Sequence, residues 1–214
     1  MPGLIRDVVP DATRSVDHLG PTVYVAAGSA GVVIVNASDP AAPAVVRTVA
    51  TGTFDRRLDV DEAGARLAVA SGSYSTNTGA VTCFSLANPA QPVRTVRYSS
   101  PSVAEDVAWA ADRSGQTRLY AAVTSDGVVV LDAGAGRVAG SYDFLRDVAP
   151  GANRIVSVPS GAGRAVAAGV YVARVSGGAV WPPAPGTPTG GGVRLAGGHT
   201  SLTRWRRALR PVPA

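Results

Sequence analysis

The sequence predicts an all-β chain that forms part of a β-propeller, with about three to four four-stranded blades of about 48 residues each. A glycine followed by an apolar run recurs at Gly31, Gly79 and Gly127, at intervals of 48 residues. A short apolar strand precedes each of these glycines, and a pair of prolines follows the first two apolar runs. The composition agrees, because 25 glycines, 16 prolines and few aromatic residues are typical of many short strands separated by turns.

Each repeat is expected to hold four strands, the first nearest the propeller axis. In the first repeat they are expected at 8–9, 23–27, 31–36 and 45–49. In the second they are expected at 58–60, 67–70, 79–84 and 93–96, and in the third at 107–109, 119–122, 127–132 and 137–142. The second and third strands are apolar almost throughout, as expected where other sheets cover both faces. A linear β-solenoid is the alternative, and its shorter usual repeat disfavours it.

The repeats predict blades over residues 1–180 and a separate tail over 181–214. The expected blade boundaries are roughly 5–54, 55–104, 105–145 and 146–180. The fourth repeat lacks the proline pair, and the tail is rich in proline, glycine and arginine. All 15 acidic residues lie in 1–147, whereas 148–214 hold 8 arginines. The tail is therefore interpreted as a disordered basic segment or an out-of-frame reading. Three blades and a fragment leave open sheet edges, which predict self-association.

Residues 24–43 carry the motif Tyr-Val-Ala-x-Gly-x-x-Gly-Val-Val-Ile-Val-Asn-x-Ser-Asp-Pro-x-x-Pro, which resembles the LVIVD repeat. The resemblance extends over roughly 5–175. The second repeat departs from the motif by an insertion at 73–78, and the third lacks the Asp-Pro pair. The family is expected to form β-propellers and is common in bacterial and archaeal cell-surface proteins, mostly of unassigned role. An extracellular or cell-surface location is implied by this resemblance alone, because the N-terminal residues lack the pattern of a signal peptide.

Charged residues precede each expected innermost strand, where loops of a propeller approach the axis on one face. The candidate binding residues are Asp7, Asp55, Arg57, Asp106 and Asp147. One interpretation is a mixed-charge surface that binds a polar partner or an ion. The other, which we favour, is that these residues cap loops and pair with neighbouring blades.

The function expected from these features is a non-enzymatic module that binds an unidentified protein or polar ligand within a larger cell-surface protein. The alternative is a fragment of a propeller hydrolase, lactonase or quinoprotein-like oxidoreductase, with a metal held at the axis by the aspartate series. Calcium is expected only under that alternative, and otherwise no cofactor is expected. A third interpretation is a non-functional remnant of a broken gene.

Other chemistries lack their motifs, so no catalytic or metal-ligating residue is predicted. The single cysteine, Cys83, is expected to be a buried and inert thiol. His18 is expected in a loop, and neither it nor His199 has a partner at metal-ligand spacing. Arginines are not accompanied by a pattern of base-stacking aromatic residues, so nucleic-acid binding is not expected. No apolar run reaches the ~18 residues that span a membrane.

Overall fold

The computed structural model describes 13–111, 115–124, 127–133, 137–142, 152–158, 169–174, 177–181 and 202–204. All regular elements in these ranges are β-strands, and they form four four-stranded sheets, here called sheets 1 to 4 in chain order. The chain divides into two compact units, 1–107 and 108–214, and each is described separately.

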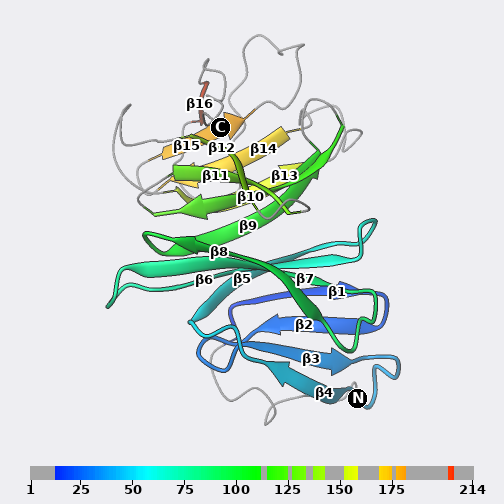
Figure 1. Cartoon of the computed structure of the whole chain (residues 1–214). Helices are drawn as coiled ribbons and strands as arrows, with labels where there is room; N and C mark the ends of the chain where they lie inside the picture. The colour runs from blue at the N-terminus through cyan, green and yellow to red at the C-terminus, as the bar shows by residue number, and fades with distance from the viewer. Residues whose placement is uncertain are drawn as a thin grey trace. The chain divides into compact units, whose positions relative to one another are not determined.

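The first unit contains two antiparallel sheets whose strands lie in chain order (Figure 1). Sheet 1 comprises β1 (Ser15–Leu19), β2 (Thr22–Ala26), β3 (Val32–Asn36) and β4 (Ala44–Val49). Sheet 2 comprises β5 (Asp55–Asp61), β6 (Arg66–Ser73), β7 (Thr78–Ser85) and β8 (Val93–Ser100). The β6–β7 hairpin is longer than the β2–β3 hairpin, because sheet 2 contains the inserted residues 73–78.

The second unit holds most of sheet 3 and all of sheet 4. Sheet 3 comprises β9 (Ala104–Ala111), β10 (Thr117–Val123), β11 (Gly127–Asp132) and β12 (Arg137–Tyr142), and β9 begins in the first unit. Sheet 4 comprises β13 (Ala152–Val158), β14 (Gly169–Arg174), β15 (Gly177–Trp181) and β16 (Leu202–Arg204). The β15–β16 pairing is parallel, unlike that of β13–β14 and β14–β15. β16 lies inside the range predicted as a tail.

Sheets 1 and 2 pack face to face over a shared apolar core. Tyr24 and Ile34 from sheet 1 meet Leu67, Val69 and Phe84 from sheet 2, and all five side chains are buried. Fully burying such a side chain contributes roughly 1.5–3 kcal/mol. The opposite face of β2 and β3 is also buried. Both faces of these strands in sheet 1 are thus buried, and among the described residues sheet 2 covers one of them.

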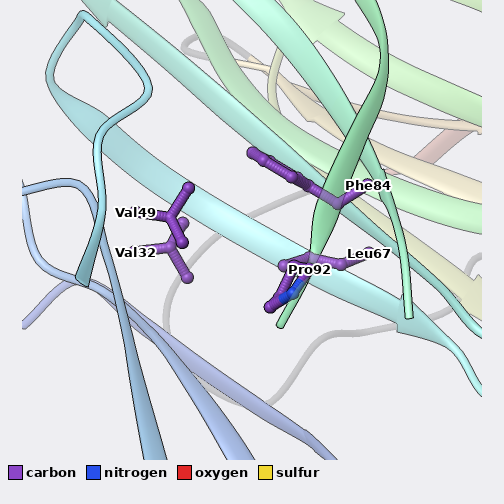
Figure 2. A pocket seen from close by; sticks show the side chains of 5 residues that line it. All are labelled: Val32, Val49, Leu67, Phe84 and Pro92. Carbon is purple, nitrogen blue, oxygen red and sulfur yellow. The ribbon is translucent and has the colours of Figure 1, made fainter. Parts of the chain in front are cut away.

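A small apolar gap remains where the two sheets meet (Figure 2). Val32 and Val49 line it from sheet 1, and Leu67, Phe84 and Pro92 line it from sheet 2. It does not admit a water molecule. The gap is thus a feature of packing between the sheets and offers no polar group to a ligand.

Strands β1 and β5 lie side by side and run in the same direction. The Ser15 hydroxyl donates to the Leu58 carbonyl oxygen at 3.5 Å, and the Val60 N–H donates to Asp17 Oδ2 at 2.8 Å. Both partners advance by two residues from one bond to the next, so the two strands share one direction. These bonds join the first strands of two consecutive sheets.

The first strand of sheet 1 is not where the sequence placed it. Residues 8–9 lie outside the described residues, and the strand that pairs with β2 is Ser15–Leu19. The prediction that His18 lies in a loop is therefore wrong, because His18 is in β1 and pairs with Val23. Exposed and half-buried residues alternate along β1, so its sequence carries no apolar run.

The described charged residues that were predicted to precede the innermost strands lie within those strands. Asp55 is already paired with Ser71, and Arg57 with Ala70, at the start of β5. Asp106 is the third residue of β9. Both strands begin earlier than their apolar segments because pairing with the next strand continues through the charged residues.

A pair of glycines in the β6–β7 hairpin lies directly against the segment that leads into β9. Gly72 pairs with Gly79 across the hairpin. A methyl group added at Gly79 would lie 2.4 Å from the Ser102 carbonyl oxygen and 2.6 Å from the Ala104 nitrogen. Both are backbone atoms, so the contact can be relieved only by moving the chain.

We therefore expect Gly79→Ala to lower the free energy of unfolding by about 2 kcal/mol, because the added methyl group forces two backbone segments apart. Chemical denaturation followed by circular dichroism measures it. Ser99→Ala is the matched control at an exposed position of β8 and should change stability by less than about 0.5 kcal/mol. Equal unfolding curves for the two variants would contradict the close approach.

Candidate functional site

Three of the five predicted binding residues are described, and they do not form an exposed group. Asp55 is fully buried and Asp106 is 5% exposed. The half-buried Arg57 donates a hydrogen bond from Nη1 to the Arg14 carbonyl oxygen. Asp7 and Asp147 lie outside the described residues. The carboxylates of Asp55 and Asp106 are therefore not surface groups.

A cluster that reaches the surface through Arg14 and Tyr74 lies beside the predicted residues, and none of its members is among the five candidate binding residues. We call it the guanidinium–aromatic cluster, and it comprises Arg14, Phe54, Arg56, Tyr74 and Glu105. Arg14 precedes β1, Phe54 precedes β5, Arg56 is in β5, Tyr74 is in the β6–β7 turn, and Glu105 is near the start of β9. All five lie in the first unit. The cluster thus joins residues that are far apart in sequence.

Two arginines and two aromatic rings stack in this cluster. The Arg14 guanidinium carbon lies 5.0 Å from the centre of the Phe54 ring, and that of Arg56 lies 5.7 Å from the same ring. Arg56 also lies 4.4 Å from the centre of the Tyr74 ring. At such distances a guanidinium is attracted to the aromatic quadrupole by roughly 0.5–1 kcal/mol at an exposed position.

Glu105 fixes the position of Tyr74 and Arg56. The Tyr74 hydroxyl donates to Glu105 Oε1, and Arg56 Nη1 lies 3.6 Å from Glu105 Oε2. Arg56 Nε also donates to the Gly72 carbonyl oxygen at 3.3 Å. Burial and the bond to Glu105 raise the pKa of Tyr74, so its hydroxyl remains a donor at neutral pH. Tyr74 is nevertheless 59% exposed, which makes it a large aromatic side chain held in place at the surface.

The start of β5 separates Asp55 from its two neighbours. Asp55 is buried and paired with Ser71, whereas Phe54 precedes the strand and Arg56 lies at a shift of register between Asp55 and Arg57. Phe54 and Arg56 contribute to the cluster, and Asp55 does not. One signal was available, because Tyr74 belongs to the insertion at 73–78, and inserted loops often carry binding groups.

Asp55 is a buried carboxylic acid at the junction of sheets 1 and 2. Its backbone N–H donates to the Gly28 carbonyl oxygen at 2.9 Å, and its Oδ1 accepts a bond from the Thr51 hydroxyl at 2.6 Å. Its Oδ2 is buried without a hydrogen-bond partner among the described residues. Burial raises the pKa of Asp55 from 3.8 to about 7, while the Thr51 bond and the charge of Arg97 act in the opposite direction.

The described residues contain no group of three or more histidine, cysteine, aspartate or glutamate side chains arranged to hold a metal ion.

Cys83 is buried, and burial raises the pKa of its thiol to about 12. It is therefore protonated at neutral pH, as expected of an inert core residue. In the same part of the chain, none of the elements is a helix with the length and apolar character needed to cross a membrane.

Comparison with known proteins reveals a fold likeness without a family. No protein-family model matches the chain, and no curated protein matches its sequence. The structure is similar to that of the computationally designed Ika4 protein, with a TM-score of 0.59 and 10% identity, over 82% of this chain and 93% of that chain. It is also similar to Saccharomyces cerevisiae Sqt1, with a TM-score of 0.47 and 10% identity, over 80% of this chain. The chain spans 58% of the length of Sqt1.

The raised pKa of Asp55 predicts that stability falls as pH rises. The folded chain holds the proton up to about pH 7, whereas the unfolded chain releases it near pH 3.8. The contribution is thus fully present below about pH 4 and is lost as pH rises through about 7. We expect the free energy of unfolding to fall over this range by at most about 4 kcal/mol.

Denaturation curves at intervals between about pH 4 and pH 8 measure this fall. Asp55→Asn should abolish it, since the amide does not titrate. Asp39→Asn is the control at an exposed carboxylate in the β3–β4 turn, and should retain the fall of the unmodified chain. A stability profile of the unmodified chain that is flat over this range would contradict the assignment.

Proposed function

We propose that this chain is a β-propeller module that binds another protein and performs no catalysis, in a larger cell-surface protein of the kind that the LVIVD resemblance implies. Four consecutive four-stranded sheets support the propeller, because each such sheet corresponds to one blade. The parallel course of β1 and β5 also supports it, since innermost strands of neighbouring blades run in the same direction around an axis. The fold likeness to Ika4 is compatible with this proposal.

The guanidinium–aromatic cluster is the surface through which this module binds. The observation that carries this proposal is Tyr74, which is 59% exposed and yet is held by Arg56 and Glu105. Tyrosine and arginine are the residues most enriched among those that dominate binding energy at protein interfaces. Because the ring is already positioned, this chain loses little conformational entropy when a partner binds to it.

Catalysis is the less supported alternative. The enzyme interpretation requires aspartates of the predicted series to converge on a substrate or a metal. Asp55 and Asp106 are the two described members of that series, and both are buried. An exposed aromatic and guanidinium surface suits the recognition of a protein better than it suits bond cleavage.

Site-specific photo-crosslinking in intact cells tests the proposal. A benzoylphenylalanine residue replaces Tyr74 in one chain, and Val93 on β8, which is 65% exposed, in the control chain. We expect one discrete protein adduct from position 74 and not from position 93, because only the first lies in the binding surface. An excess of the unmodified chain should suppress the adduct, and an excess of the Tyr74→Ala chain should suppress it less.

Two results would count against the proposed surface. The first is that positions 74 and 93 form the same adducts, because this would indicate random collision with abundant proteins. The second is the absence of any adduct from position 74 at expression levels where the chain is folded, as judged by its thermal unfolding.

A further inference from the structure

We infer that the guanidinium–aromatic cluster recognises an acidic peptide segment of its partner, with carboxylates of that segment bound by Arg14 and Arg57. This inference rests on the proposed function and adds the chemistry of the partner. The juxtaposition that carries it is a pair of arginines, Arg14 and Arg57, joined by a hydrogen bond from the second to the backbone of the first. Arg14 lies over the Phe54 ring, and no carboxylate of the described residues is paired with either arginine.

The described side chains that make these contacts carry a net positive charge. Arg14, Arg56 and Arg57 contribute three positive charges, and Glu105 contributes one negative charge. Glu105 pairs with Arg56, one of the two arginines of the cluster, and leaves Arg14 and the neighbouring Arg57 uncompensated. Asp55 and Asp106 are buried and do not offset the charge at the surface. A partner that brings carboxylates complements the two remaining cations.

Arg14 and Arg57 are placed to act together. The Arg57 side chain donates to the backbone carbonyl oxygen of Arg14, which ties one arginine to the residue that bears the other. A guanidinium has five N–H donors, and this bond uses one of those on Arg57. The Arg14 guanidinium lies over the Phe54 ring, and no carboxylate of the described residues is paired with its N–H groups. Guanidinium edges bind carboxylates through paired hydrogen bonds.

A peptide is favoured over a nucleic acid because guanidiniums already cover part of the aromatic surface. Phe54 has two guanidiniums within 5.7 Å of its ring centre, and Tyr74 has Arg56 at 4.4 Å. Single-stranded nucleic acids bind such surfaces largely by stacking bases on open aromatic faces. The exposed part of Tyr74 remains available, and it suits the aliphatic or peptide groups of an extended segment.

The experiment uses two fluorescent peptides that differ only in charge, measured by fluorescence anisotropy with the full chain. One alternates glutamate with tyrosine and alanine, and the other has glutamine in place of every glutamate. We expect the glutamate peptide to bind about tenfold more tightly at about 25 mM salt, with most of that difference lost at about 300 mM salt. Equal affinity for the two peptides would overturn the inference.

Arginine variants locate the site. Arg14→Gln and Arg57→Gln should each weaken binding of the glutamate peptide by about fivefold, while Arg57→Lys should retain part of it because the charge remains. Arg94→Gln is the matched control at an exposed arginine on β8, and should bind as the unmodified chain does. A loss with Arg94→Gln equal to that with Arg14→Gln would show non-specific attraction and would overturn the assignment.

Charge reversal keeps the test independent of small losses of stability. Arg14→Glu should no longer bind the glutamate peptide and should gain affinity for the same peptide made with lysine in place of glutamate.

A single-stranded RNA oligonucleotide that binds more tightly than the glutamate peptide, in an Arg14-dependent manner, would replace the peptide proposal. If crosslinks form at position 74 while the glutamate peptide does not bind, this inference fails and the proposed function stands. If both are absent, both fail.

Discussion

The structure of the first unit depends on how the start of β5 is fixed between two sheets. The Asp55 N–H donates to the carbonyl oxygen of Gly28 in the β2–β3 turn, while the neighbouring carbonyl oxygen of Phe54 accepts the N–H of Gly72 in sheet 2. One short segment therefore satisfies backbone groups on both sides. Because the backbone is held there, the side chains on its two faces have defined places: the acid inside, and the ring and the guanidinium outside.

An apolar core shared by sheets 1 and 2 accompanies these backbone bonds. The small side chain of Ala26 is completely buried in it, beside larger residues such as Tyr24 and Leu67. The Tyr24 hydroxyl reaches across to donate to the Pro89 carbonyl oxygen at 2.9 Å. Packing and polar contacts thus hold sheets 1 and 2 in the same arrangement.

The sequence predicted the repeated sheets well and the site poorly, for physical reasons. The glycines at 31, 79 and 127 lie within one residue of the start of a strand, because hairpin geometry is a local property that a short motif specifies. β1 escaped notice because strands with one exposed face, such as Ser15–Leu19, carry polar residues. The cluster of Arg14, Tyr74 and Glu105 depends on contacts between residues dozens of positions apart, which spacing along one chain does not encode.

The paired glycines at 72 and 79 divide the β6–β7 hairpin into two parts with different freedom to change. At the pair itself, the backbone near Val103 lies so close that neither glycine has room for a side chain. Between the two glycines, at the tip of the hairpin, residues 74–78 are exposed. Substitutions and insertions there leave the sheets undisturbed. Recognition can therefore diversify at this tip while the scaffold is conserved, and the tip is equally suited to accept a grafted loop.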